Sequence, residues 1–241
     1  MSLLSILKSN KPKKPPTCTA VIAAAGISQR CEGEDKLFYR INDKPVLAYT
    51  IEVFQNCTLV NEIIIVAHEG RIESISELCE TYGFDKVSKI MIGGATRLDS
   101  VVNGVYAASD KSYLIAIHDG ARPCVDLSIV KETILCAGMY NAAAPAVAIA
   151  STVKKVDAGV IKETVNREGL YEIQTPQVFR AELIKAALTN AQKKSLDVTD
   201  DCMAVELIGA DVRIVEGSRR NIKITDNKDL HIIEAFINEE S

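Results

Sequence analysis

The sequence predicts an α/β fold in which helices cover both faces of a mostly parallel, twisted sheet. Short apolar runs alternate with amphipathic segments along most of the chain, and this alternation is typical of βαβ units. The first apolar run, at 18–24, is rich in small and β-branched residues, as strands buried on both faces are. The chain has 241 residues, of which 47% are hydrophobic and 25% charged, so it can bury one large core.

The pattern places strands and helices in succession from residue 18 onward. Strands are expected at 18–24, 62–67, 89–92, 113–118, 142–150 and 212–216. Helices are expected at 45–56, 71–82, 96–108, 128–140, 181–192, 200–208 and 226–238. Ligands of open parallel sheets bind beyond the carboxyl ends of the strands, where the strand order reverses. Gly26, the glycines at 93–94 and His118 with Asp119 each lie at such an end, so we expect them to converge on one crevice.

A glycine turn with two cations follows the first strand. Gly26 ends the apolar run, and Arg30 and Lys36 come after it. Backbone N–H groups at such a turn can point at phosphate oxygens, and the cations add charge. The segment lacks the second glycine of a dinucleotide fingerprint and the Gly-Lys-Ser/Thr of a P-loop. It therefore indicates a triphosphate site of another type, with an ordinary turn carrying two solvated cations as the alternative.

Residues 151–175, here called the arm, interrupt the alternation. Two runs of alternating apolar and polar residues flank Asp157-Ala158-Gly159, a pattern that predicts a β-hairpin. Because a two-stranded ribbon is barely stable alone in water, we expect the arm to lie against a second subunit in a homodimer. The alternative is that it folds back on its own sheet.

Charge and cysteine usage argue against several classes of protein. The net charge is −4, which gives no electrostatic reason to expect binding to nucleic acid or to a membrane. The seven cysteines and three histidines are scattered, with no C-x-x-C pair, so we expect reduced thiols and no zinc site. We therefore expect a cytoplasmic protein. We also expect residues 1–16 to be an extension and residues 17–241 to form a single domain that carries the arm.

Seven segments occur in an order that is specific to one family. They are A-A-A-G-x-x-x-R at 23–30 with the later Lys36, G-G-A-T-R-L-D-S at 93–100, H-D-G-A-R-P at 118–123, T-V-N-R-E-G-L-Y at 164–171, Q-T-P-Q at 174–177, T-D-D at 199–201 and N-I-K-I-T at 221–225. From about residue 17 onward the chain resembles the 2-C-methyl-D-erythritol 4-phosphate cytidylyltransferase family. The resemblance implies a Rossmann-like nucleotidyltransferase fold with a projecting β-arm. It also implies transfer of the cytidylyl group of CTP to 2-C-methyl-D-erythritol 4-phosphate, giving 4-diphosphocytidyl-2-C-methyl-D-erythritol and pyrophosphate in non-mevalonate isoprenoid biosynthesis.

The resemblance also implies roles for the residues that match the family's motifs. The nucleotide-binding residues are Ala24, Ala25, Gly26, Gly94, Ala95, Ser100 and Asp119. The catalytic cations are Arg30, Lys36 and Lys223, and the cofactor is Mg²⁺ on Asp119. The residues for the sugar-alcohol phosphate are Arg122, Thr152, Arg167 and Thr175. In a homodimer, Arg167 is expected to serve the neighbouring active site.

The chemistry of this reaction suits these residue types. A phosphate oxygen that attacks the α-phosphate of CTP is already ionised, so positioning replaces a strong base. Cations and a metal stabilise the developing charge, and Mg²⁺ prefers carboxylate, water and phosphate oxygens. Alanine stands at 23 and 95, where the family often has proline and aspartate. These departures put turn rigidity and one side-chain contact to the nucleotide in doubt.

Three other functions remain open from the sequence. A pentitol-phosphate cytidylyltransferase, for example one that uses ribitol 5-phosphate, shares the glycine turn, the Asp-x-x-Arg-Pro and the Q-T-P-Q. A dinucleotide-dependent oxidoreductase is disfavoured by the missing glycines and by the lack of an acidic residue after the second strand. A non-catalytic nucleotide-binding module is disfavoured because Arg30, Lys36, Asp119 and Lys223 are all present.

Overall fold

The structure, a computed structural model, describes residues 17–26 and 35–239. The predicted extension at 1–16 and the predicted catalytic residue Arg30 lie outside the described residues, so both stay predictions. In the described ranges, no helix combines the length and apolarity needed to cross a membrane.

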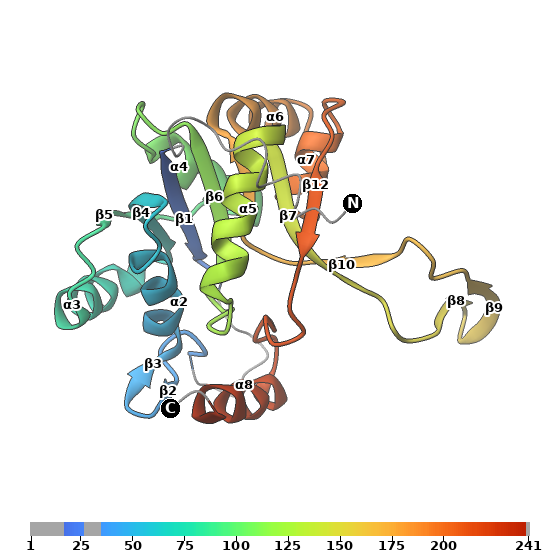
Figure 1. The fold of residues 1–241 in the computed structure, drawn as a ribbon, viewed down its shortest axis with the longest axis horizontal. Helices are drawn as coiled ribbons and strands as arrows, with labels where there is room; N and C mark the ends of the chain where they lie inside the picture. The colour runs from blue at the N-terminus through green and yellow to red at the C-terminus, as the bar shows by residue number, and fades with distance from the viewer. Residues whose placement is uncertain (1–16, 27–34, 240–241) are drawn as a thin grey trace.

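Eight strands form one central sheet with helices on both sides (Figure 1). Its strands are β1 (Cys18–Ala24), β4 (Val60–Ala67), β5 (Val87–Ile92), β6 (Leu114–Asp119), β7 (Ala142–Ala148), β10 (Tyr171–Ile173), β11 (Gln177–Arg180) and β12 (Arg213–Glu216). The helices are α2 (Val46–Gln55), α3 (Ile72–Tyr82), α4 (Arg97–Ala107), α5 (Leu127–Tyr140), α6 (Ala181–Lys193), α7 (Asp201–Glu206), α8 (Asn227–Glu239) and the short 3-10 helix η1 (Glu69–Arg71).

The order of the strands creates a switch point beside β1. The sheet runs β10-β7-β11-β6-β1-β4-β5, with β12 paired to β7. From β1 the chain moves outward through β4 to β5 and then returns to β6 on the other side of β1. These four strands are parallel. The carboxyl ends of β1 and β6 therefore flank the place where such sheets bind ligands.

The residues of each central strand alternate between two hydrophobic cores. Cys18, Ala20 and Ile22 of β1 pack with α2, α3, α5 and α8 on one face. Val21 of β1 and Ile64 of β4 pack with α4, α6 and α7 on the other face. Successive side chains of a strand point to opposite faces, so a strand covered on both faces is apolar at nearly every position. This explains the continuous apolar runs in the sequence.

The predicted succession of helices and strands is confirmed, with ends shifted by at most two residues. The sequence did not predict β10, β11 or the small pair β2 (Arg40–Ile41) and β3 (Lys44–Pro45). β11 runs antiparallel between β6 and β7, so the sheet is mixed at this side. Two to four residues are too few to show an alternating pattern, which explains why these strands were missed.

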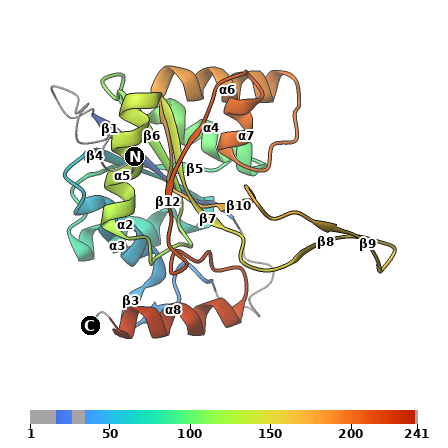
Figure 2. The same cartoon turned by 45° about the vertical axis from the view of Figure 1, so that its right-hand side comes forward.

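The predicted hairpin is present and projects from the body of the molecule (Figures 1 and 2). Strands β8 (Val153–Asp157) and β9 (Val160–Val165) form a separate two-stranded sheet, here called the hairpin. Ala158 and Gly159 between them have φ values of 46° and 77°, as the type I′ turn of a tight hairpin requires. Only β10, at the end of the arm, returns to pair with β7. The alternative that the whole arm folds back on its sheet is therefore wrong.

Candidate active site

The end of β5 packs directly against the turn that follows β1. Ala24 is buried, Ala25 is half-buried and Gly26 is exposed. A Cβ atom on Gly93 would lie 2.5 Å from the Cβ of Ala25, closer than two carbon atoms can approach. Glycine at this position therefore allows the two predicted nucleotide segments to meet.

Backbone hydrogen bonds hold the ends of the neighbouring strands together. The Gly93 N–H donates to the Ala67 carbonyl at the end of β4, at 2.8 Å. The Gly120 N–H, just after β6, donates to the Ala23 carbonyl of β1 at 2.9 Å. The strand ends that the sequence placed at one crevice therefore do converge.

Gly94 and Ser100 are joined at the start of α4. The Gly94 N–H donates to the Ser100 hydroxyl at 3.0 Å, and that hydroxyl donates to the Thr96 carbonyl at 2.9 Å. A Cβ atom on Gly94 would clash with Asp99. Ala95, between these residues, is exposed. Ser100 therefore shapes the glycine segment, and the Gly94 N–H is already used within it.

Asp119 lies at the end of β6 between two cations. Its Oδ2 atom is 3.0 Å from Lys223 Nζ and 3.4 Å from Arg122 Nε. Burial alone would raise the pKa of this carboxyl, but Lys223, Arg97 and Arg122 outweigh burial and lower the pKa to about 2. Asp119 is therefore ionised at neutral pH and holds both cations beside the switch point.

The two predicted catalytic lysines that the structure describes meet at one segment. Lys36 Nζ donates to the Ile224 carbonyl at 2.8 Å, one residue beyond Lys223. Residues 221–225 form no strand, and the Ile224 N–H donates to the Ala121 carbonyl at 2.9 Å. The Lys223 side chain is 40% exposed, so it can meet a ligand while it binds Asp119.

Thr175 and His118 form a buried hydrogen-bonded chain that holds the backbone of Asp119. The Thr175 hydroxyl accepts the Asp119 N–H at 3.2 Å and lies 2.9 Å from His118 Nδ1. Burial lowers the pKa of His118 to about 4, so its ring is neutral. We assign the hydroxyl as donor to Nδ1, which leaves Nε2–H to donate to the Arg122 carbonyl at 3.2 Å. Thr175, predicted to bind the acceptor, is only 4% exposed and fixes the backbone of the crevice.

Asn221 ties three of the sequence segments together. Its Nδ2 atom donates to the Thr175 carbonyl at 2.9 Å and to Gln174 Oε1 at 3.3 Å. Its own carbonyl accepts from Arg122 Nη1 at 2.6 Å. Asn221 and Gln174 both lie in segments that the sequence analysis identified, but it assigned no role to either residue. Side-chain amides can bridge backbone groups of separate loops, and this property is the signal that could have identified them.

A partly buried ion pair links the glycine segment to the Thr-Asp-Asp segment. Arg97 at the start of α4 binds Asp201 with both terminal nitrogens, at 3.0 and 2.7 Å. Burial raises the pKa of the Asp201 carboxyl, although Arg97 opposes the shift. Gln177 Oε1 accepts the N–H groups of Asp201 and Cys202, each at 3.0 Å. Sequence reasoning missed Arg97 and Asp201, which lie 104 residues apart.

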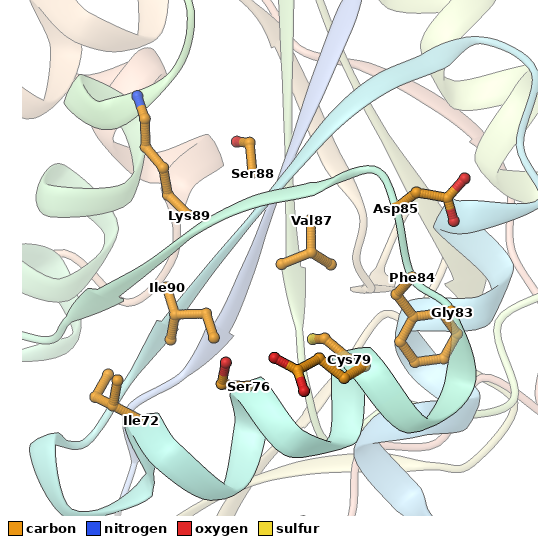
Figure 3. Close-up of a pocket in the computed structure, with 11 residues that line it drawn as sticks. Ile72, Ser76, Cys79, Gly83, Phe84, Asp85, Val87, Ser88, Lys89 and Ile90 are labelled. Atoms are coloured by element: carbon orange, nitrogen blue, oxygen red, sulfur yellow. The ribbon is translucent and has the colours of Figure 1, made fainter.

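A cavity of about 410 Å³ opens beside Arg122 and Lys223, the two cations that bind Asp119. Two of its walls are the predicted residues Arg122 and Lys223, and Arg219, Glu172 and Gln174 add charge and polarity. A larger hollow of about 530 Å³ lies between α3 and β5 (Figure 3). None of the predicted site residues lines that hollow, so the cavity beside Asp119 is the candidate acceptor site. Arg219 is a cation of this site that the sequence analysis did not identify.

Thr152 and Arg167 lie apart from this cluster. Both are exposed on the arm, and the Arg167 guanidinium donates to the Ala150 carbonyl just before the arm. Within the described residues, no hydrogen bond or ion pair joins either residue to Asp119, Arg122 or Lys223. The predicted acceptor residues are therefore divided between the crevice and the arm.

The switch-point crevice, the glycine segments and the ring of cations define a Rossmann-like nucleotidyltransferase. The chain belongs to the 2-C-methyl-D-erythritol 4-phosphate cytidylyltransferase (IspD) family, whose model matches residues 18–239. The resemblance seen in the sequence is thus confirmed over nearly the whole chain.

Relatives and solved structures agree with this membership. The chain is 39% identical over 223 residues to the 2-C-methyl-D-erythritol 4-phosphate cytidylyltransferase of Alkaliphilus oremlandii, covering 91% of this chain and 94% of the relative. It is 40% identical over 225 residues to the enzyme of that name from Clostridium acetobutylicum, covering 92% and 98%. The crystal structure of 4-diphosphocytidyl-2C-methyl-D-erythritol synthase from Anaerococcus prevotii superposes with a TM-score of 0.82 at 28% identity, covering 93% and 97%.

Proposed function

We propose that this chain transfers the cytidylyl group of CTP to 2-C-methyl-D-erythritol 4-phosphate. A phosphate oxygen of the acceptor forms a bond to the α-phosphorus of CTP. The bond from that phosphorus to the oxygen bridging to the β-phosphate breaks, and pyrophosphate leaves with the electron pair. The observation that carries the proposal is the cluster of Asp119, Lys223, Arg122 and Lys36 at the switch point of this family's fold.

The crevice supplies charge and position to this reaction. The acceptor phosphate is ionised at neutral pH, so the chain has to place it and to stabilise developing charge. Lys36 and Lys223 bring positive charge from two segments that meet at Ile224. Asp119 orients Lys223, and Arg30 is kept as a further proposed cation.

Backbone groups are proposed to bind the cytosine. The Ser100 hydroxyl holds the Gly94 N–H, which leaves the Gly94 carbonyl and the backbone of exposed Ala95 to face a base. A base read through backbone groups does not require the aspartate that the family often has at position 95. The alanine there is therefore compatible with CTP binding.

The cavity beside Asp119 is proposed to hold the acceptor. Arg122, Arg219 and Lys223 line it, and guanidinium and ammonium groups bind phosphate oxygens. Glu172 and Gln174 on its wall can accept or donate hydrogen bonds to sugar-alcohol hydroxyls. Thr152 and Arg167 are proposed to reach this cavity from the arm of a partner subunit.

Asp119 also fits the proposed Mg²⁺ cofactor. Its carboxylate is ionised, and its ion pairs with Arg122 and Lys223 both fall on Oδ2, so Oδ1 has no ion-pair partner among the described residues. The described His, Cys, Asp and Glu side chains form no group of three that could hold a metal, so phosphate and water oxygens would supply the other ligands. The bound ion would neutralise charge on the triphosphate.

A homodimer built through the arm is part of the proposal. Val156, Val160 and Ile161 of the hairpin are 55%, 56% and 62% exposed, and apolar side chains at this exposure gain from cover by another surface. No disulfide joins the described cysteines, which supports a cytoplasmic location. The net charge of −4 supports a chain that binds its anionic substrates locally and has no nucleic-acid partner.

The proposed function is tested by pyrophosphate release from CTP and Mg²⁺ with three acceptor conditions. We expect release with 2-C-methyl-D-erythritol 4-phosphate, and none with ribitol 5-phosphate or without an acceptor. Ribitol 5-phosphate is the matched control, since it offers the cavity the same phosphate and hydroxyl chemistry. Release with ribitol 5-phosphate alone would contradict the proposal in favour of a pentitol-phosphate enzyme. Binding of CTP without release under any condition would indicate a non-catalytic module.

A further inference from the structure

Arg71 lies at the end of η1 and reaches across to the turn after β1. Its Nη1 atom donates to the Ala24 carbonyl at 3.2 Å and to the Gly26 carbonyl at 3.1 Å. Its Nε atom is 2.5 Å from Asp35 Oδ2. The side chain is only 14% exposed, so the guanidinium is largely removed from water by these three partners.

The contact with Asp35 fixes the turn that carries Lys36. The other carboxylate oxygen of Asp35 accepts the Leu37 N–H at 3.1 Å. The Asp35 carbonyl accepts the N–H groups of Phe38 and Tyr39, at 2.9 and 3.0 Å. Arg71 therefore holds Asp35, whose hydrogen bonds form this turn. The side chain of Lys36 extends from the same turn to the Ile224 carbonyl.

The contact with β1 fixes the direction of its last peptide groups. In a trans peptide, the carbonyl of one residue and the N–H of the next point in opposite directions. The described chain has one cis peptide, at Thr175-Pro176, so the bond from Ala24 to Ala25 is trans. Because Arg71 binds the Ala24 carbonyl, the Ala25 N–H points away from Arg71. The Ala24 carbonyl, which would repel phosphate, therefore faces Arg71. The Ala25 N–H, which can donate to phosphate, faces the side of the turn away from Arg71.

We propose that Arg71 is a positioning residue for the triphosphate of CTP. It joins the turn after β1 and the turn that carries Lys36 through one guanidinium, and it orients an N–H donor in the first and a cation in the second. A guanidinium suits this task because its planar fork can bind a carboxylate and carbonyl groups at once, which an ammonium does not reproduce. This inference deepens the proposed function and rests on it.

The test compares Arg71→Gln, Arg71→Lys, Asp35→Asn and the double variant Arg71→Gln/Asp35→Asn. We expect Arg71→Gln to raise KM for CTP, and the Kd for CTP from calorimetry, by about tenfold. KM for the acceptor is expected to stay within about twofold, and Arg71→Lys is expected to be intermediate. The double variant is expected to be no worse than the more affected single variant, because the two residues act through one contact.

A matched control is Arg180→Gln. Arg180 also pairs with a carboxylate, Glu182, and lies over the Tyr113 ring, at the start of α6 and outside the crevice. We expect this variant to leave KM for CTP unchanged.

Three results would overturn the positioning role. They are an unchanged KM and Kd for CTP in Arg71→Gln, additive effects of the two substitutions, and equal losses for both substrates with a lowered melting temperature. If the native chain binds CTP but does not turn over, the proposed function fails, and the calorimetric Kd values still decide the role of Arg71. A native chain that does not bind CTP would overturn both.

Discussion

The crevice and the hairpin differ in how their side chains are held. In the crevice, Asp119 is 8% exposed and its carboxylate and backbone N–H are bound by Lys223, Arg122 and Thr175. In the hairpin, apolar side chains such as Ile161 are mostly exposed, and the partners of its polar groups belong to the arm itself. One chain alone therefore positions the groups that we propose to act on CTP. Thr152 and Arg167, which we propose to bind the acceptor, would need a second subunit to complete a site.

The largest expected effect is in the crevice, for Lys223→Ala. We expect turnover to fall by about 100-fold or more, because we propose that this cation acts on charge that develops in the transition state. The melting temperature should change little, since the Lys223 side chain is 40% exposed. Steady-state kinetics and thermal unfolding check this, with Lys185→Ala on the surface of α6 as the control. Turnover within about fivefold of the native value would remove Lys223 from the catalytic groups.

A second effect concerns His118, which is buried beneath the crevice, and the dependence of the free energy of unfolding on pH. The pKa of His118 is lowered to about 4 by burial, so between about pH 6.5 and pH 4 the unfolded chain binds a proton that the folded chain does not. The stability that neutral His118 contributes is therefore fully present above pH 6.5 and is lost as the pH falls toward 4. The free energy of unfolding decreases by about 3 kcal/mol over this range. The difference in unfolding free energy between the native chain and His118→Gln should narrow over this range. Urea titrations at several pH values measure it, and a constant difference would show that His118 does not titrate as proposed.

A third effect belongs to the hairpin, where Val156 and Ile161 are cross-strand partners. Changing both to aspartate places charge on the apolar face that we propose to be covered by the partner. We expect the dimer dissociation constant to rise by about tenfold or more, with no loss of stability of the body. Sedimentation at several concentrations checks this. Lys162→Asp, on the opposite face of β9, is the control, and equal effects from both changes would argue against a specific apolar contact.

The smallest effect is at the hairpin turn. Ala158 has a φ of 46°, which asparagine adopts more readily than alanine. Ala158→Asn should stabilise the hairpin by up to about 1 kcal/mol, seen as slower amide exchange in β8 and β9. Gly159→Ala should do the opposite, because φ there is 77°, a conformation that alanine disfavours even though an added Cβ atom would meet no neighbour. The same change in exchange for both substitutions would contradict a type I′ turn.

Much of the fold could be predicted because the signals are local. The continuous apolar run at 18–24 marks a strand covered on both faces, and the strand-end rule brought Gly26, the glycines at 93–94 and Asp119 to one crevice. The lysine at 223 was placed beside that crevice by resemblance, although its segment proved to be irregular.

The missed features depend on contacts between distant residues. Arg71 binds segments 36 to 47 residues before it, and Arg97 binds Asp201 across 104 residues. Nothing in the local pattern distinguishes these arginines from solvated ones. The pairing of Thr175 with His118 was hidden for the same reason, since a buried hydroxyl and a surface hydroxyl look alike in a sequence. β11 was missed because four residues carry too little periodicity.

The division of the site between the crevice of one chain and the arm of another is tested most directly by complementation. Arg167→Ala and Lys36→Ala chains, each expected to be nearly inactive alone, are mixed and their heterodimers are purified with two different tags. We expect activity to return, because one of the two sites in each heterodimer then combines an intact Lys36 with a partner's intact Arg167. Inactive heterodimers, or a native chain that is monomeric by sedimentation at full activity, would contradict the shared site.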